Sequence, residues 1–500
     1  MTHRPLTLFV CTALAALGGC TVGPHYAGPP AVTPRAASGA AFARAGDLKR
    51  DPPPALAAWW ETLGDAGLND LEARALAADP DLAAAKARLR QARASLREQK
   101  ANQAPSLDAT ALYAHAELPG VNFGGVTGSQ GTSSGASSTS GSSTSSAASS
   151  ASTSTSLDIY DVGFDASWEI DLFGGQRRAV QAAGATAEAA AADLADVEVS
   201  LTAEVASAYL NLRDRQARIA LNARAVAMQN QMLGLTRQRF DRGAASKLDV
   251  ERLSQQLDRT RADAVPLKAE LDAYADELAV LTGQEPGALD ASLMEARPLP
   301  LPPAEVEVGD PAALLKRRPD VRAAERTLAA DTAKVGQAEA ARFPQLKFMG
   351  IVGVGGTQPS NLTNLDDLTT LIAPQLSWSF LDFGRTRARV TEADAVREEA
   401  EAKYRKAVLG ALRDAEDALS RFRYRRISVA VLARTKASAD QAVELQKARY
   451  AAGTATLIDL LDAEHQQVDA DQSLSVATAG LSGDFVSIQK ALGLGWRVGR

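Results

Sequence analysis

The chain has 500 residues, of which 46% are hydrophobic, 23% charged and only 5% aromatic. This composition can bury a core, but the low aromatic content favours thin helical packing over a thick globular interior. The formal net charge of −6 is small for this length and excludes the strongly basic balance of a nucleic-acid-binding protein.

The N-terminus has the pattern of a bacterial export signal. An apolar run from Leu6 to Leu17, too short to span a bilayer, is followed at once by Gly18, Gly19 and Cys20. This spacing resembles that of bacterial lipoproteins, in which the chain is cut before the cysteine and the thiol is acylated. We expect residues 1–19 to be the signal peptide and Cys20 to be the lipid attachment site, with an ordinary signal peptide as the alternative. Two or more acyl chains would anchor the protein firmly.

The rest of the chain contains two copies of one unit. Pro80-Asp81-Leu82 matches Pro319-Asp320-Val321 at a spacing of 239 residues, and Ser167-Trp168 matches Ser377-Trp378 at a spacing of 210. The spacings differ by 29 residues, which indicates an insertion in the first copy. The Gly-, Ser- and Thr-rich stretch at 128–156 accounts for it and is predicted to be a disordered loop.

Each copy is predicted to hold a helix, two strands, a very long helix and a shorter helix. Apolar and polar residues alternate over Tyr160 to Ile170 and over Ile372 to Phe380, with another strand over Leu346 to Val354. Pro374 is awkward because proline removes a ladder donor and usually marks an edge or a bulge. A soluble sandwich could show this alternation, but so could lipid-facing strands of an outer-membrane barrel. The glycines at Gly350 to Gly356 are predicted to form a hairpin turn.

The long helix of the first copy is predicted from Gly175 to Phe240, a length of about 100 Å. Its apolar residues recur at every seventh position: Val205, Leu212, Ile219, Val226, Leu233 and Phe240. The second copy repeats this pattern with Lys436 as its one break. Such a period predicts a left-handed coiled coil with the shorter helix that follows.

Four strands per chain cannot close a barrel, so several chains are needed. Cyclic association of three copies is the predicted solution. The predicted fold is mainly α, with an internal two-fold repeat and long coiled-coil helices. Its four strands per chain would complete a trimeric, 12-stranded membrane β-barrel above an α-helical tunnel.

Three stretches carry a resemblance to a known family: Cys20 to Tyr26, Trp59 to Leu76, and Leu314 to Glu325. Together they resemble the outer-membrane factor family of TolC-like ducts, and within it the NodT-type lipoproteins of resistance-nodulation-division efflux systems. The resemblance covers nearly the whole mature chain.

The resemblance implies the following organisation. Residues 20–75 would form an N-terminal tail and equatorial segment, 76–283 the first copy, 284–310 an equatorial linker, 311–493 the second copy and 494–500 a C-terminal tail. The protein would be a homotrimer anchored by lipid in the outer membrane, with a tunnel in the periplasm. Its partners would be a periplasmic adaptor and an inner-membrane pump.

The resemblance also implies particular site residues. The stretch from Arg449 to Ala463 resembles the family's periplasmic tip, whose constriction is lined by an aspartate at the position of Asp462. Asp462, Asp459 and Tyr450 would belong to the channel gate, and Arg252, at the position equivalent to Asp462 in the first copy, would latch it. The turns at Gly243 and Gly453 would contact the adaptor.

The sequence lacks the usual signatures of an enzyme. It contains no His-Glu-x-x-His, no Gly-x-Ser-x-Gly and no phosphate-binding loop, so no catalytic residue, metal or cofactor is expected apart from the lipid on Cys20. Three hypotheses remain: a duct for small molecules, the same duct serving type I protein secretion, and a periplasmic coiled-coil adaptor. The predicted strands count against the adaptor, and the kind of cargo stays open.

Overall fold

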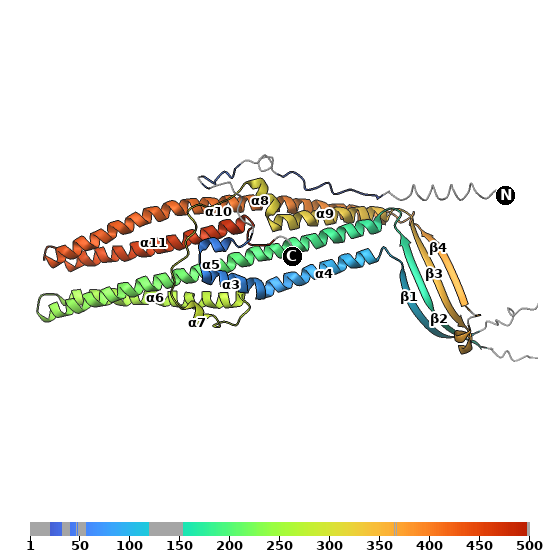
Figure 1. Ribbon diagram of the computed structural model, residues 1–500, viewed down its shortest axis with the longest axis horizontal. Helices are drawn as coiled ribbons and strands as arrows, with labels where there is room; N and C mark the ends of the chain where they lie inside the picture. Colours follow the sequence, from blue (N-terminus) through green and yellow to red (C-terminus); the bar gives the residue numbers. More distant parts are fainter. Residues whose placement is uncertain are drawn as a thin grey trace, which may run out of the picture. The chain divides into compact units, whose positions relative to one another are not determined.

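The computed structural model describes residues 21–32, 41–46, 48, 57–119, 154–364, 366 and 368–497. The chain divides into a sheet unit, Met1–Gly23, Arg97–Val180 and Gly336–Val390, and a helical unit, Pro24–Leu96, Gln181–Val335 and Thr391–Arg500. The elements of both units are labelled in Figure 1. Cys20, the predicted lipid attachment site, lies outside the described residues.

The internal repeat is confirmed by matched pairs of helices. The pairs are α4 (Pro80–Ala101) with α9 (Pro319–Ala340), 22 residues each, α5 (Gly175–Asp241) with α10 (Arg385–Ala451), 67 each, and α6 (Lys247–Leu281) with α11 (Leu457–Ala491), 35 each. The long helix predicted from Gly175 to Phe240 is α5, which ends one residue later, at Asp241.

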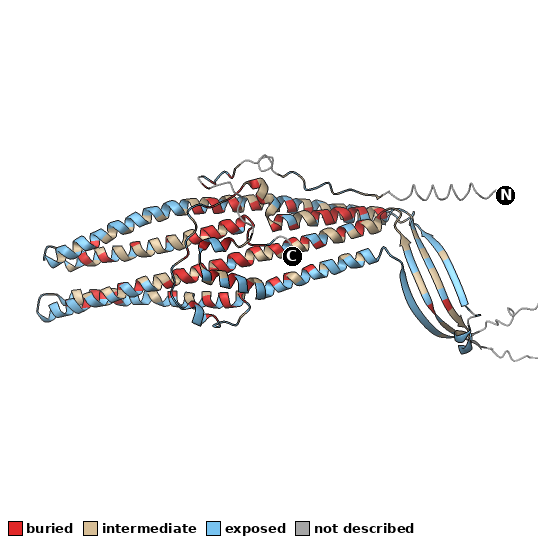
Figure 2. Cartoon of the chain, in the orientation of Figure 1, coloured by how far each residue is buried: buried red, intermediate tan, exposed pale blue. Residues whose placement is uncertain are grey.

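The seven-residue pattern marks the buried stripe of the long helices. Val205 and Leu212 on α5 and Val408 and Phe422 on α10 are all buried. Figure 2 shows that burial is dense along the middle of these helices and sparse near residues 243 and 453. Lys436, the break in the pattern, lies where its ammonium can pair with Asp471 of α11 at 2.7 Å. Each long helix thus packs as a coiled coil, as predicted.

Shorter elements form a belt on the middle of the helical unit. They are η1 (Trp59–Leu63), α3 (Ala66–Ala78), α7 (Asp290–Leu293) and α8 (Pro311–Arg317). Arg213 of α5 is buried and ties the segment after α7 to the bundle, since its Nη1 donates to the Glu295 carbonyl at 2.8 Å. The boundary predicted between residues 75 and 76 falls inside α3, which Asp65 caps and which continues to Ala78.

The sheet unit contains four antiparallel strands in the order β1-β2-β3-β4. Their bounds are β1 Ser106–Pro119, β2 Ser154–Ile170, β3 Gln345–Gly356 and β4 Leu368–Ser377. The prediction of a turn at Gly350 to Gly356 is wrong, because these residues lie in β3 and the connection is η2 (Pro359–Thr363). Gly163 and Gly353 face each other so closely that a Cβ on Gly163 would lie 2.8 Å from the Gly353 Cα atom.

Two predicted strand ends are also corrected. The loop predicted at 128–156 lies mostly outside the described residues, but Ser154–Ser156 belong to β2, because the antiparallel ladder continues to the pair Pro119 and Ser154. The strand predicted to reach Phe380 ends at Ser377, which pairs with Gln345. The next partner would be Pro344, which has no N–H to donate. Pro374 lies on β4 opposite Phe348 of β3.

Candidate functional site

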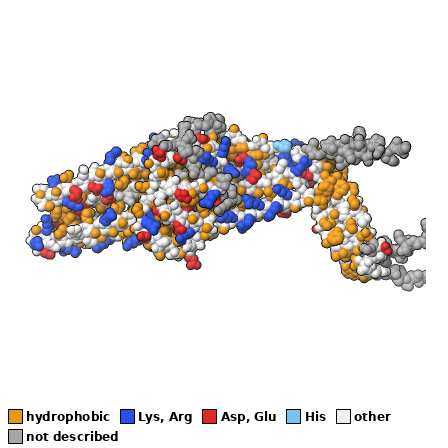
Figure 3. All heavy atoms as spheres, in the orientation of Figure 1, with side chains coloured by type: hydrophobic (Ala, Val, Ile, Leu, Met, Phe, Trp, Pro, Cys, Tyr) orange, Lys and Arg blue, Asp and Glu red, His pale blue; other side chains and the backbone are white. Residues whose placement is uncertain are grey.

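One face of the sheet carries an uncovered apolar surface. Along β2 this face consists of Tyr160, Val162, Phe164, Ala166 and Trp168, which register with apolar residues or glycines of β3. Several of these side chains are exposed. Figure 3 shows hydrophobic side chains over the strands and charged ones gathered over the helices. An apolar patch of this extent marks an interaction surface rather than a free surface.

Aromatic pairs bound this apolar surface. Tyr113 and Tyr160 lie with ring centroids 5.0 Å apart at one end, and Trp168 and Phe348 lie 6.5 Å apart at the other. Tyr160 and Trp168 are eight residues apart, which corresponds to about 26 Å of strand. The apolar band of strands that cross an outer membrane is about 25 Å tall between aromatic girdles. The sheet therefore has the dimensions of a lipid-facing wall.

The opposite face of the sheet carries aspartates on β1 and β2, and on β3 and β4 it also carries Met349, Ile351 and Leu371. Asp108 lies directly across from Asp165, and Asp161 follows four pairs further along on the same face. Like charges at opposed positions destabilise an isolated sheet, so these carboxylates need a high dielectric. Glu169 is partly neutralised by Lys347, whose Nζ lies 3.3 Å from the carboxylate. The apolar face of the sheet is suited to lipid, and the aspartates on the other face of β1 and β2 are suited to water.

In the part of the chain that the structure describes, no helix is both long and apolar enough to cross a membrane.

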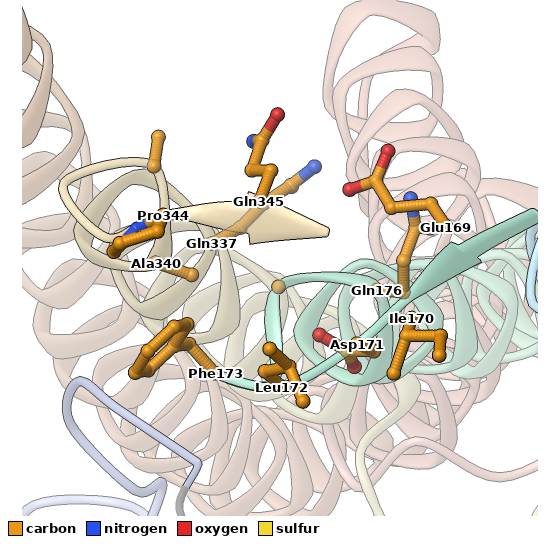
Figure 4. A pocket seen from close by; sticks show the side chains of 12 residues that line it. Glu169, Ile170, Asp171, Leu172, Phe173, Gln176, Gln337, Ala340, Pro344 and Gln345 are labelled. Carbon is orange, nitrogen blue, oxygen red and sulfur yellow. The ribbon is translucent and has the colours of Figure 1, made fainter. Parts of the chain in front are cut away.

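A pocket of about 170 Å³ lies in the sheet unit where strands meet helix ends (Figure 4). Its polar side chains come from β2, β3, α5 and α9. The carboxylate of Asp171 accepts from the Arg177 backbone N–H at 2.8 Å and from its Nε at 3.3 Å. Because Asp171 accepts from the first turn of α5 and Glu169 pairs with Lys347, the polar groups of the pocket join elements of the two copies.

The predicted turns at Gly243 and Gly453 end the long helices in the same way. Both glycines have positive φ, 73° and 75°. The N–H of the next residue reaches back to a carbonyl in the last helical turn, from Ala244 to Arg239 at 2.8 Å and from Thr454 to Arg449 at 2.9 Å. These contacts form a Schellman motif, which requires the left-handed conformation. A Cβ on either glycine would meet no atom within 4 Å, so both turns present open surface.

The two predicted gate carboxylates differ in their surroundings. Asp459 closes a capping box: its Oδ2 accepts from the Thr456 backbone N–H at 2.9 Å and from Thr456 Oγ1 at 2.7 Å. These hydrogen bonds hold the pKa of Asp459 below its usual value. Asp249 and Ser246 build the same box in the first copy. Asp462 is exposed and makes no hydrogen bond or ion pair with the described residues.

Tyr450 is held by a residue that the sequence argument missed. Arg239, at the end of α5, donates from Nη1 to the Tyr450 hydroxyl, and its guanidinium lies 4.7 Å from the centre of the Tyr450 ring. Arg252 is exposed and joins neither Tyr450 nor Asp462 in any described contact. The repeat register could have suggested Arg239, since it is the counterpart of Arg449 at the spacing of 210.

An apolar cluster joins the two copies just inside the tips. Leu233, Leu253 and Leu257 of the first copy are buried, with Leu457 and Leu461 of the second copy packed against them. Leu461 precedes Asp462 directly. A displacement of α11 at its N-terminus would therefore move Asp462 and open this cluster together.

Among the described residues, no group of three or more His, Cys, Asp or Glu side chains is placed to bind a metal ion. The nearest approach to a catalytic arrangement is His115 with Asp158, 2.8 Å apart across the β1–β2 pair and exposed. It lies on the apolar face, where the Tyr113 hydroxyl also donates to the Asp158 carboxylate at 3.1 Å, so the three side chains form one cross-strand hydrogen-bonded group.

Known proteins match this chain over nearly its whole length. A family described as outer membrane efflux protein matches residues 71–284 and 311–494, which are the two copies. Nodulation protein T of Rhizobium leguminosarum bv. trifolii is 27% identical over 483 residues, covering 96% of this chain and 95% of that protein.

The pyoverdine export outer membrane protein OpmQ of Pseudomonas aeruginosa is 30% identical over 504 residues, covering 100% of this chain and 98% of that protein. The solved structure of the outer-membrane channel OprN superposes with a TM-score of 0.83 at 33% identity. It covers 95% of this chain and 100% of that chain.

Proposed function

The chain belongs to the outer membrane efflux protein family, and from this premise we propose that three copies form one channel through which a tripartite pump exports small molecules. It is an outer-membrane protein with a role in efflux, as its sequence resemblance implied. The observation that carries the proposal is the uncovered sheet, with an apolar face bounded by aromatic pairs, aspartates of β1 and β2 on the other face, and β1 and β4 at its two edges. A closed barrel would cover both edges.

Contacts between the two copies within one chain suggest how two neighbouring chains would contact each other. Phe173 of the first copy stacks on Phe343 of the second, with ring centroids 4.7 Å apart. Its counterpart Phe383 is 93% exposed and has a positive φ of 51°. Such a backbone conformation costs about 1–3 kcal/mol and persists only where the surroundings hold it. A neighbouring chain would supply those surroundings.

In the helical unit, too, a residue that is buried in the first copy has an exposed counterpart in the second copy. Val199 on α5 is 3% exposed and packs in a cluster with Trp496, whereas its counterpart Leu409 on α10 is 50% exposed. The chain therefore buries this position in one copy and leaves it open in the other. Three chains in a ring would cover all three open positions with the same kind of contact, because cyclic symmetry repeats one interface.

The cargo is proposed to be small molecules. OpmQ is named for the export of pyoverdine, which supports this class over the proteins of a type I secretion system. A periplasmic adaptor does not fit a chain whose match to the family spans both copies. The channel would act as a passive conduit, with no catalytic activity and no cofactor.

We propose that the turns at Gly243 and Gly453 bind a periplasmic adaptor, which would link the channel to an inner-membrane pump. We also propose Cys20 as a lipid-bearing anchor. Loss of palmitate labelling in Cys20→Ala tests the anchor, and labelling that persists would refute it. The gate would consist of Asp462, Asp459 and Tyr450, with Arg239 beside Tyr450 in addition to the Arg252 latch expected from sequence.

Reconstitution into planar bilayers tests the channel itself. The purified trimer should give stepwise single-channel currents, and expression in cells that lack their own outer-membrane efflux component should restore resistance to small toxic compounds. An intact trimer that inserts but passes no current under any voltage, pH or divalent-ion condition would refute the channel. Restored protein secretion without restored resistance would favour the type I alternative.

A further inference from the structure

The first described residues, Thr21–Gly23, form a strap that lies against the sheet unit. The Val22 backbone N–H donates to the Phe173 carbonyl at 3.2 Å, in the turn between β2 and α5. Arg178, in the first turns of α5, donates from Nε to the Val22 carbonyl at 3.2 Å and from Nη2 to the Gly23 carbonyl at 3.1 Å. Hydrogen bonds from a charged donor are stronger than neutral ones, so Arg178 contributes most to this binding.

Three glycines allow the strap to approach this closely. A Cβ on Gly174 would lie 2.7 Å from Thr21 Cγ2, and a Cβ on Gly23 would lie 2.4 Å from the Gly336 Cα atom. A Cβ on Gly336 would lie 2.8 Å from Arg178 Nε. Real Cβ atoms do not approach other atoms this closely, so any larger residue would displace the strap or the guanidinium. The strap therefore fills a space that these residues leave for it.

Arg178 itself is only 2% exposed. A buried guanidinium is costly unless its donors are satisfied. The strap carbonyls satisfy two of the donors of this buried guanidinium. The neighbouring Arg177 has a different role, since its Nε bonds the carboxylate of Asp171 at 3.3 Å.

The second copy builds the same turn, but no described segment lies against it as the strap does in the first copy. The counterpart of Arg178 at the spacing of 210 is Ala388, and the counterpart of Gly336 at the spacing of 239 is Arg97. Gly384, the counterpart of Gly174, has nearly the same φ, 88° against 82°, but a Cβ on it would meet nothing within 4 Å. The turn needs a glycine in both copies, whereas the close packing and the arginine occur only where the strap lies.

We propose that Arg178, Gly174 and Gly336 form a binding site for the chain's own N-terminal strap, Thr21–Gly23, and that Arg178 holds this strap at the turn between β2 and α5. The site binds two backbone carbonyls and one backbone N–H, so it recognises an extended segment with small residues. If Cys20 carries lipid, as proposed above, the acyl chains begin one residue from this site. Only that last consequence depends on the proposed function.

Hydrogen exchange of the full mature protein tests the site. In the parent trimer, the peptide that contains Val22 should exchange slowly, because its N–H is bonded to the Phe173 carbonyl. Arg178→Ala should speed this exchange by about tenfold or more, and Arg178→Lys should have a smaller effect. Arg177→Ala should leave the strap protected. Unchanged exchange in a folded Arg178→Ala trimer would overturn the proposal.

A glycine pair keeps the test decisive if Arg178→Ala does not fold. Gly174→Ala and Gly384→Ala impose the same positive-φ strain, but only Gly174 contacts the strap. Faster strap exchange in Gly174→Ala alone supports the site, and equal exchange in both variants refutes it. Hydrogen exchange of the strap is measured independently of single-channel current. A trimer that conducts no ions can therefore still show a protected strap, and a conducting trimer can show an unprotected one.

Discussion

Asp459 and Asp462 lie three residues apart on α11 but have different chemical roles. The carboxylate of Asp459 caps the helix through Thr456, and its lowered pKa keeps it ionised. Since a depressed carboxyl pKa stabilises the fold above the unfolded value of about 3.9, the cap is intact at neutral pH and is lost only as pH falls through the folded pKa. Asp462 is exposed and makes no such hydrogen bond with the described residues, so its carboxylate is available to face a pore.

Substitution of these two aspartates should therefore give different results. Asp462→Ala is predicted to raise single-channel conductance and to weaken block by divalent cations, because one ring of exposed charge is removed. Asp459→Ala should instead loosen the first turn of α11, seen as faster amide exchange there. Planar-bilayer recording checks the first outcome. Conductance and divalent block in Asp462→Ala equal to those of the parent would exclude it from the gate.

Glu72 on α3 gives a pH-dependent prediction. It is fully buried, and neither carboxylate oxygen has a partner among the described residues, so burial raises its pKa well above the ordinary value. The folded state then binds the proton more tightly than the unfolded state. Stability is highest below the unfolded pKa of about 4.3 and falls as pH rises toward the folded pKa.

Glu72→Gln should remove this pH dependence and stabilise the protein at pH 8, by about 1–3 kcal/mol for a buried unpaired polar group. Thermal melting at pH 5 and pH 8 measures the difference between parent and variant. Glu61→Gln, which changes an exposed acid in η1, is the matched control. A parent and a Glu72→Gln variant that melt with the same pH dependence would contradict the assignment.

At the scale of the elements, helices were predicted better than strands. The long helices carry a seven-residue period over 67 residues, a signal that few alternatives can imitate. Where each strand ends depends on whether the neighbouring strand offers a residue that can pair with it. Trp168 stays in β2 because it pairs with Phe348 of β3, whereas Trp378 leaves β4 opposite Pro344. Both indoles nonetheless donate to equivalent carbonyls, those of Gln103 and Arg342.

The side-chain contacts at the candidate sites were harder to predict. The contacts of Arg239 with Tyr450 and of Arg178 with the strap join residues more than 150 positions apart. The repeat register relates Arg239 to Arg449 but identifies the partner of neither arginine. The glycine turns were predicted correctly because a left-handed helix end is a local property. The capping role of Asp459 was also readable locally, from Thr456 three residues before it.

The helix tips give a prediction about the adaptor. Cysteines at Ala244 and Thr454, which follow the two turn glycines, should cross-link to a periplasmic adaptor, because the turns expose backbone and side chains without covering contacts. Cysteines on the strap-side end of α5, for example at Gln176, should not cross-link to it. Cross-linking assayed in intact cells gives the readout. Failure at both tips in an assembled trimer would remove these turns from the contact.

At the scale of the whole molecule, Phe383 gives a prediction about assembly. Phe383→Ser should weaken the trimer, because it removes an exposed aromatic held in a strained conformation for a neighbouring chain. Native mass spectrometry of dilute protein in detergent should show more monomer than for the parent. Leu409→Ser should act in the same direction. A Phe383→Ser protein as trimeric as the parent on dilution would mean that the rings do not meet across this interface.

The duplication has a consequence for how the assembly comes apart. The contact between Phe173 and Phe343 joins two parts of one polypeptide, so its effective concentration is set by the linker and does not change on dilution. The equivalent contact at Phe383 would join separate molecules and obey mass action. Two chemically similar interfaces would then alternate around the ring, and only every second one could open. Subunits would exchange as whole duplicated chains, and mixing two labelled populations would never scramble the copies within a chain.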